Sequence, residues 1–331
     1  MSKLPRICTP TLSFVEHYPQ FRKFADQQLK VLWFWDEIKL EKDVQDILVN
    51  MTEAERHGVI TVLRLFTLYE LFAGSDHWCG MMLKRYPRPE IQAMCTVYGS
   101  IELGVHQPFY ARLNELLNLN TDEFYLSYVN DPILKERIDF IDQMINIPED
   151  SEFNKALSTA SFSMVEGAVL YTSFAYLKHF QTQGKNKLVN GGRGINFSAV
   201  DENMHSEGGA ALFKQHWAEA KALDNTLSDE AMIAALKEVA EKIREHEYRI
   251  IDMIFEKGVV KGITANQLKH FVDSRLNICM VNLGFEKLYE VKYNPIADWF
   301  YNGLNNYQFV DFFTGQGREY QRNWDAERFV W

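Results

Sequence analysis

Four stretches of this 331-residue sequence place carboxylates among residues that are otherwise uncharged and largely apolar. They are Glu70 within residues 65–75, Glu102 within 91–111, Glu166 within 156–177 and the pair Asp201–Glu202 within 194–206. Burying one ionised carboxylate without a partner costs several kcal/mol, so four would exceed a typical folding free energy of about 5–15 kcal/mol. No uncharged run reaches the roughly 18–20 residues that cross a membrane. Protonation of all four carboxyls is one solution, and two bound metal ions are the other.

Two nearby histidines favour bound metal ions over protonated carboxyls. Glu202 and His205 are three residues apart, and Glu102 and His106 are four apart, so each pair shares one helix face. Two glutamates from separate helices plus two Glu/His pairs form the ligand set of dinuclear carboxylate bundles, and such oxygen and imidazole donors suit iron or manganese. The sequence therefore predicts a dinuclear metal site with the ligands Glu70, Glu102, His106, Glu166, Glu202 and His205.

The pair Glu102–His106 contains one residue more than the regular motif. Pro108 also denies the carbonyl of Gly104 its helical hydrogen bond, and together these features predict a π-bulge. A competing interpretation keeps three-residue spacing and puts Leu103 at the ligand position. We favour Glu102, because an unpaired buried glutamate beside the site would be harder to explain.

The elements that position these residues are predicted to be helices. Apolar residues recur mostly at i, i+3, i+4 spacing, and no proline lies between Pro148 and Pro295. Helices are expected at 20–31, 53–84, 90–117, 121–146, 151–183, 195–222, 228–257 and 264–287. Thr52 with Glu55 predicts a capping box, and Ser228 predicts another helix start. Glycine-rich breaks are expected at Gly191–Gly194, Gly258 and Gly262. The sequence predicts one all-α domain, 1–301, and a flexible tail, 302–331.

The composition limits which binding partners and which cellular compartment we expect. The formal net charge is −10, from 45 acidic and 35 basic residues, which disfavours contact with nucleic acid. The cysteines are scattered without a C-x-x-C pair, which argues against a zinc knuckle or a disulfide scaffold. They are Cys8, Cys79, Cys95 and Cys279. The first residues lack the apolar core of a signal peptide, so we expect a cytoplasmic protein without a membrane anchor.

Further segments carry recognisable motifs. Trp33 lies in the segment 28–38, and Asp201 opens an Asp-Glu-x-x-His sequence. Tyr110 follows His106 by four residues, and Tyr320 lies between Glu319 and Gln321, after a Phe-Phe pair. With these motifs the chain resembles, over nearly its whole length, the radical-generating small (beta) subunit of class I ribonucleotide reductase.

The resemblance implies a ferritin-like helical bundle in which a dinuclear centre activates oxygen and Tyr110 stores a radical. It implies that Asp201 bridges His106 and Trp33, and that Tyr320 relays the radical toward a separate large (alpha) subunit that reduces ribonucleotides. A homodimer that docks on the large subunit through its C-terminal tail is implied, and a flavoprotein activase is an optional further partner. Two irons are favoured, with manganese–manganese and manganese–iron pairs as alternatives.

Two other functions use a similar bundle. A stand-alone di-metal oxidase or hydroxylase would need a substrate tunnel and no large subunit, and an iron-storage bundle would be shorter and would assemble into cages. Four tyrosines are interpreted as core residues: Tyr69, Tyr98, Tyr171 and Tyr176. The histidines outside the motif are interpreted as structural: His17, His57, His77, His179, His216, His246 and His270.

Overall fold

The computed structural model describes residues 4–302, and over that range every regular element is helical, which confirms the all-α prediction. The α-helices are α1 (Pro19–Lys30), α2 (Glu53–Leu71), α3 (Leu83–Arg85), α4 (Pro89–Ile101), α5 (Gln107–Leu116), α6 (Asp122–Asn130), α7 (Pro132–Ile145), α8 (Glu152–Ala168), α9 (Tyr171–Lys178), α10 (Val189–Leu223), α11 (Asp229–Ile254) and α12 (Ala265–Leu283). Three π-helical segments lie at Asp46–Asn50, Phe72–Met82 and Glu102–His106, and short 3-10 turns lie at Arg6–Cys8, Trp35–Glu37, Leu40–Lys42 and His179–Gln181.

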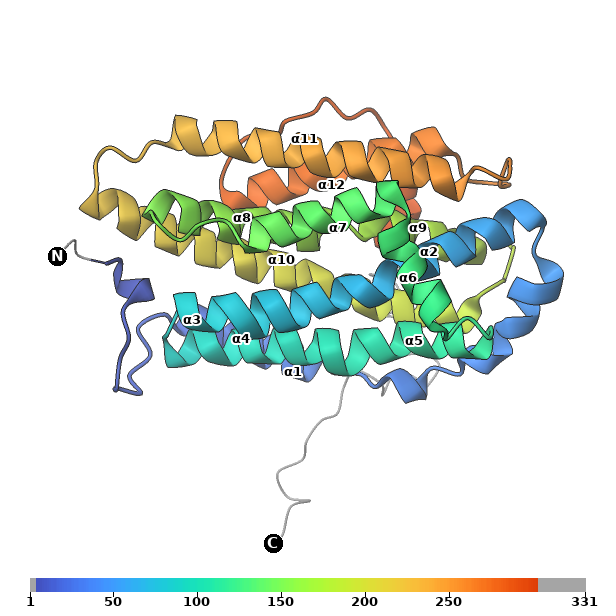
Figure 1. Ribbon diagram of the computed structural model, residues 1–331, viewed down its shortest axis with the longest axis horizontal. Helices are drawn as coiled ribbons and strands as arrows, with labels where there is room; N and C mark the ends of the chain where they lie inside the picture. Colours follow the sequence, from blue (N-terminus) through green and yellow to red (C-terminus); the bar gives the residue numbers. More distant parts are fainter. Residues whose placement is uncertain (1–3, 303–331) are drawn as a thin grey trace, which may run out of the picture.

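The long helices run roughly along the longest axis of a ferritin-like bundle (Figure 1). Helices α8 and α10 pack along one another, and α11 and α12 cover one side of that pair. Helix α2 and the α4–α5 run lie on the other side. The four stretches with isolated carboxylates therefore belong to helices that line a common interior.

Small residues let α8 and α10 approach closely. The hydroxyl of Ser163 donates to the main-chain oxygen of Ser206 at 2.7 Å, and the hydroxyl of Ser206 donates to the main-chain oxygen of Ser163 at 2.8 Å. A Cβ on Gly167 would lie 2.5 Å from the Ser206 hydroxyl oxygen, which is closer than carbon and oxygen can pack. These contacts set the spacing of the two helices beside Glu166, which lies between Ser163 and Gly167 on α8, and Glu202, which lies one turn before Ser206 on α10.

The predicted π-bulge is confirmed, because Glu102–His106 is π-helical between α4 and α5. A second π-helical segment, Phe72–Met82, continues α2 where regular helix was expected. The single helix expected over 121–146 is wrong, since Asp131 is extended (φ −83°, ψ 122°) and separates α6 from α7. Pro132 explains the division, because a proline pushes the preceding residue out of the helical region.

The expected break at Gly191–Gly194 is also wrong. Helix α10 begins at Val189 and continues through these glycines. The carboxylate of Asp43 accepts hydrogen bonds from the main-chain N–H groups of Asn190 and Gly191 and so satisfies donors of the first turn. Gly194 is required for packing, because a Cβ there would lie 2.3 Å from the ring of Phe109.

The predicted helix starts are confirmed. The Thr52 hydroxyl accepts from the Glu55 N–H at 3.2 Å, and the Glu55 carboxylate accepts from the Thr52 N–H at 2.9 Å. Ser228 accepts from the Ala231 N–H at 3.2 Å and begins α11. Both caps are local, so the sequence alone could specify them.

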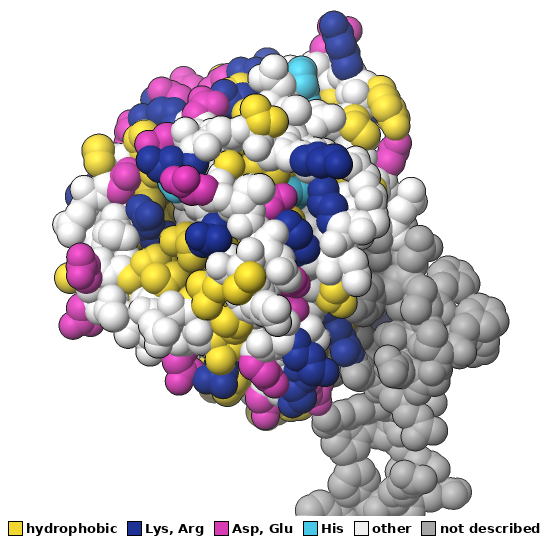
Figure 2. All heavy atoms as spheres, turned by 90° about the vertical axis from the view of Figure 1, so that its right-hand side faces the viewer, with side chains coloured by type: hydrophobic (Ala, Val, Ile, Leu, Met, Phe, Trp, Pro, Cys, Tyr) yellow, Lys and Arg dark blue, Asp and Glu magenta, His cyan; other side chains and the backbone are white. Residues whose placement is uncertain are grey.

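One helical run, Glu53–Arg85, is long and apolar enough to span a membrane by composition, but 65% of its apolar window is buried inside the protein. Burial against neighbouring helices is what a core helix shows. On the end of the molecule seen in Figure 2, acidic and basic side chains are interspersed among apolar ones.

Arg137 on α7 and Glu247 on α11 form a buried ion pair with a separation of 2.9 Å and side chains that are 1% and 0% exposed. The guanidinium also donates to the Tyr128 hydroxyl, and the Thr172 hydroxyl donates to the Glu247 carboxylate. Each side chain of the pair therefore has a further hydrogen-bond partner in the protein, while Nη2 of Arg137 is buried and has none among the described residues.

We predict that Arg137→Met or Glu247→Leu alone lowers the free energy of unfolding by about 3–5 kcal/mol, because each leaves a buried charge without its partner. The double variant recovers much of that loss. Urea unfolding of the four metal-free proteins at one pH measures the cycle, and losses that simply add would contradict the coupling.

Candidate metal centre

The six residues predicted as ligands lie in the interior of the bundle. Their side chains come from α2 (Glu70), the π-helical segment (Glu102 and His106), α8 (Glu166) and α10 (Glu202 and His205). Five are 0% exposed and Glu166 is 1% exposed. The helices therefore bring together side chains that are up to 135 residues apart in the sequence, from Glu70 to His205.

The donor atoms form two overlapping groups. One contains Glu70, Glu102, His106 and Glu202, and the other contains Glu102, Glu166, Glu202 and His205. Within each group one donor atom from every residue lies within 4.8 Å of the others. Glu102 and Glu202 belong to both groups, which is the arrangement of two carboxylates that bridge a pair of metal ions.

The π-helical turn places the side chains of Glu102 and His106 next to each other. The Nδ1 atom of His106 lies 2.9 Å from Oε2 of Glu102, and Nδ1 of His205 lies 2.5 Å from Oε1 of the same carboxylate. Leu103, the competing candidate, is half-buried and is absent from both donor groups. Glu102 thus lies between the two histidines.

Several of these ligand atoms have no hydrogen-bond partner within the described part of the chain. Neither carboxylate oxygen of Glu70 or of Glu202 receives a hydrogen bond, although all four atoms are buried. Buried carboxylate oxygens without partners cost free energy that a bound cation offsets. Four carboxylates carry four negative charges, which two divalent ions balance. The donor set therefore fits a dinuclear metal site, with oxygen and nitrogen ligands that suit iron or manganese.

Electrostatics lead to the same conclusion. Burial raises the pKa of Glu70 well above its usual value, and the neighbouring Glu102 carboxylate raises it further. Burial also raises the pKa of Glu166, with Glu202 as the charged neighbour. Burial lowers the pKa of His205, but the carboxylates of Glu102 and Glu202 together outweigh burial and raise that pKa to about 9. The cluster on its own retains protons, and metal ions would replace them.

Residues that sequence analysis missed support Glu166. The hydroxyl of Tyr69 donates to Oε2 of Glu166 at 2.9 Å, and Nε1 of Trp78 donates to Oε1 at 2.6 Å. Tyr69 is buried as expected of a core residue, but its hydroxyl also orients a ligand. Neither residue has a characteristic spacing from Glu166, so only the packing of α2 and its π-helical extension against α8 could identify them.

Asp201 lies between Trp33 and His106. Its Oδ2 accepts from Nε1 of Trp33 at 2.8 Å and lies 3.1 Å from Nε2 of His106. Its Oδ1 accepts from the buried side chain of Gln28 at 2.7 Å, a contact that the sequence did not indicate. The imidazole of His106 is therefore held through Nε2, which leaves Nδ1 facing the carboxylate cluster.

Tyr110 lies beside the same cluster and is 1% exposed. Its ring stacks on Phe66 with a centroid separation of 4.2 Å, and the His106 ring centroid is 6.4 Å away. Burial raises the pKa of Tyr110 well above its usual value, and the Glu70 carboxylate raises it further. The phenol therefore stays protonated in an apolar pocket next to the candidate metal centre. Tyr320 lies outside the described residues.

Comparison with known proteins places these observations in a family. Residues 13–295 match the family model described as "Ribonucleotide reductase, small chain". A probable ribonucleoside-diphosphate reductase small subunit of Invertebrate iridescent virus 3 is 26% identical over 305 residues, covering 88% of this chain and 78% of the relative. The ribonucleoside-diphosphate reductase small subunit of Dictyostelium discoideum is 21% identical over 314 residues, covering 92% of this chain and 84% of the relative.

Solved structures share the fold. A putative class I ribonucleotide reductase from Bacillus halodurans superposes with a TM-score of 0.74 at 21% identity, covering 87% of this chain and 100% of that chain. A dimanganese(II) NrdF protein from Streptococcus sanguinis superposes with a TM-score of 0.70 at 17% identity, covering 87% and 97%. The chain therefore belongs to the small-chain family of class I ribonucleotide reductase, an oxidoreductase whose small subunit works with a large subunit.

Proposed function

We propose that this chain generates a tyrosyl radical at Tyr110 and supplies it to the large subunit to initiate ribonucleotide reduction. The observation that carries the proposal is the position of Tyr110, buried against Phe66 and one helical turn beyond His106. Its hydroxyl makes no well-formed hydrogen bond among the described residues, and the Ser198 hydroxyl is a polar group close to it. Exclusion of water would protect an oxidised phenol from reduction.

In this proposal Glu102 and Glu202 would each contribute to holding both ions. Glu70 and His106 would complete the ligands of one ion, and Glu166 and His205 would complete those of the other. When bound, the metal pair would draw on dioxygen to supply the one-electron oxidation of Tyr110. We favour two irons, and the same oxygen and nitrogen donors suit manganese–manganese or manganese–iron pairs.

The residues of the chain provide orientation and a route. Asp201 holds Nε2 of His106 and so keeps the lone pair of Nδ1 directed at the cluster. Trp33 donates a hydrogen bond to the same carboxylate, so Asp201 links His106 to the N-terminal segment that carries Trp33. We propose that the oxidising equivalent leaves through His106, Asp201 and Trp33, and that Tyr320 is the next relay.

We also propose an assembly for this chain. We propose a catalytic domain over residues 1–301, a tail over 302–331 that docks on the large subunit, and a homodimer of this chain. A flavoprotein activase is a further component to test. The four cysteines, all unpaired in the structure, support a cytoplasmic location.

The stand-alone oxidase or hydroxylase is not favoured. The family match covers residues 13–295, and the hydrogen bond that links Trp33 to Asp201 leads away from the cluster, which an enzyme that keeps its oxidant at the metal does not need. An iron-storage bundle is disfavoured by the same match.

We predict that Tyr110→Phe keeps about two metals per chain but loses both the stable radical and reductase activity. Electron paramagnetic resonance after loading with ferrous iron and exposure to oxygen, with metal counted in the same sample, measures this. Tyr171→Phe is the matched control, because that tyrosine is equally buried and its hydroxyl donates to the main-chain oxygen of Ala199. Full activity of Tyr110→Phe would contradict the assignment.

The two donor groups predict unequal effects of ligand loss. Glu102→Ala should reduce binding of both ions, because its carboxylate belongs to both groups, whereas Glu70→Ala should reduce binding of one. Metal counting by inductively coupled plasma mass spectrometry should then show less than one metal per chain for Glu102→Ala and about one for Glu70→Ala. Identical counts for the two variants would argue against the bridging role.

Trp33→Phe should separate radical formation from radical transfer. We expect normal metal content and a Tyr110 signal, but turnover with the large subunit reduced to background, because the hydrogen bond to Asp201 is lost. Trp217→Phe, which removes a hydrogen bond to Asp229 at the far end of α10, is the control. If Trp33→Phe turned over like the unaltered protein, the route would be wrong.

A further inference from the structure

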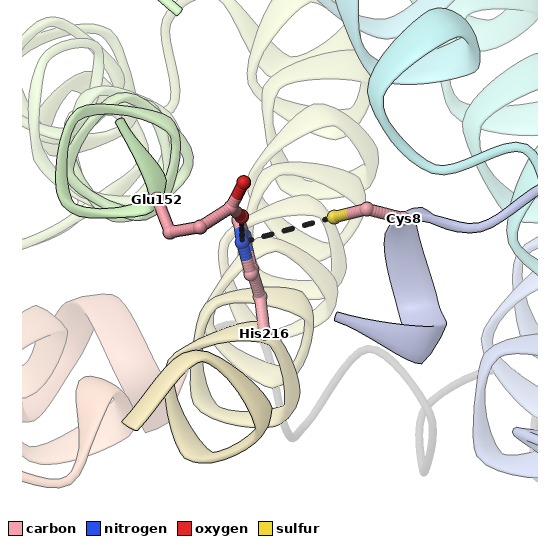
Figure 3. A group of neighbouring side chains, drawn as sticks. All are labelled: Cys8, Glu152 and His216. Atoms are coloured by element: carbon pink, nitrogen blue, oxygen red, sulfur yellow. Dashed lines mark hydrogen bonds and ion pairs between the residues drawn. The ribbon is translucent and has the colours of Figure 1, made fainter. Parts of the chain in front are cut away.

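A second group of metal-binding side chains lies away from the dinuclear site. Figure 3 shows Cys8 from the N-terminal turn, Glu152 from the start of α8 and His216 from α10 with their side chains directed at one another. His216 follows His205 by eleven residues on the same helix, which is about 16 Å along its axis. The group is therefore separate from the candidate metal centre.

The sulfur of Cys8 and a carboxylate oxygen of Glu152 both lie close to one ring nitrogen of His216. Sγ of Cys8 lies 3.7 Å from Nε2 of His216, and Oε2 of Glu152 lies 2.7 Å from the same nitrogen. In a nucleophilic cysteine arrangement the thiol and the acid contact opposite ring nitrogens of the histidine. Here both face Nε2, which is the arrangement of ligands around a cation.

The other ring nitrogen is held as in known metal sites. The Tyr86 hydroxyl lies 2.9 Å from Nδ1 of His216 and 2.8 Å from the Thr159 hydroxyl. Thr159 donates to the main-chain oxygen of Lys155 and accepts from Arg85, so its remaining capacity is to accept from Tyr86. The Tyr86 oxygen is then free to accept from Nδ1–H, which leaves Nε2 with a lone pair.

A lone pair on Nε2 and an ionised carboxylate 2.7 Å apart require a positive species between them. The opposite oxygen of Glu152 pairs with Lys155 at 2.8 Å, which leaves Oε2 for the cluster. Arg85, the other nearby cation, pairs with Glu149 at 2.7 Å. A divalent ion with the thiolate of Cys8 and the carboxylate of Glu152 would form a neutral unit.

The turn that carries Cys8 is itself fixed in place. The carboxylate of Glu219, one turn beyond His216 on α10, accepts from the main-chain N–H of Ile7 at 2.8 Å. The guanidinium of Arg88 donates to the main-chain oxygen of Arg6 at 2.6 and 3.0 Å. Cys8 is therefore held over His216 before any ion binds.

We propose that Cys8, Glu152 and His216 bind a single thiophilic divalent cation of the Zn²⁺ class, a site that does not depend on the radical chemistry. Tetrahedral Zn²⁺ would put sulfur and nitrogen about 3.6 Å apart, close to the separation seen, and nitrogen and oxygen about 3.4 Å apart. The second value requires the carboxylate of Glu152 to move outward, which its 24% exposed side chain allows. Water would take the fourth position, and the ion would fasten the N-terminal turn to α8 and α10.

Cobalt(II) tests this proposal in the protein whose dinuclear centre already holds iron. A thiolate ligand produces a sulfur-to-cobalt charge-transfer band, which the oxygen and nitrogen donors of the dinuclear centre cannot produce. We expect one cobalt per chain with this band, and loss of the band when Zn²⁺ is added. Cys8→Ser should abolish the band, while Cys79→Ser, which alters another half-buried cysteine, should leave it intact.

Tyr86→Phe provides a second variant that keeps all three ligands. It should retain the band but weaken Zn²⁺ binding roughly tenfold, because Nδ1 loses its partner. The proposal is overturned if the unaltered protein shows no thiolate band with excess cobalt, or if Cys8→Ser shows the same band. The first result would mean that protons alone hold the cluster together, and the second that a thiolate other than Cys8 binds the cobalt.

Discussion

The structure depends on one electrostatic constraint: four carboxylates are buried together at the centre of a helical bundle. In water each would be ionised, and in the protein interior their repulsion and desolvation would exceed the stability of an ordinary domain. The two histidines reduce this cost but do not remove it, since the pKa of Glu70 and that of Glu166 stay well above the usual value. A fold with this interior is therefore one in which cation binding and folding are coupled.

The surrounding elements keep this arrangement rigid. The paired serine contacts between α8 and α10 bring Glu166 and Glu202 to a short separation, and the π-helical turn rotates Glu102 onto the face of His106. Asp201 then fixes the ring of that histidine. Each device is an ordinary helix-packing feature, and together they convert a costly set of charges into a specific ligand geometry.

The same two helices carry a different donor set at their other end. Where α8 begins and α10 nears its end, a thiol and an imidazole join one carboxylate, and the nearby lysine and arginine charges are already paired. Oxygen-rich and sulfur-containing sets favour different metals. If both donor sets bind metal as proposed, the bundle would keep two kinds of ion apart by donor type and by about 16 Å of helix.

The sequence by itself predicted the features that depend on residues close together in the chain. The isolated carboxylates, the irregular Glu102–His106 spacing and the cap at Thr52 follow from residues within one or two helical turns, and the structure has the predicted π-bulge and cap. Only the tertiary structure decided which distant side chains meet. Trp78 reaches Glu166 across 88 residues, and Cys8 reaches His216 across 208. Such contacts depend on how whole helices pack, and helical periodicity specifies a buried face but not the residue that will lie against it.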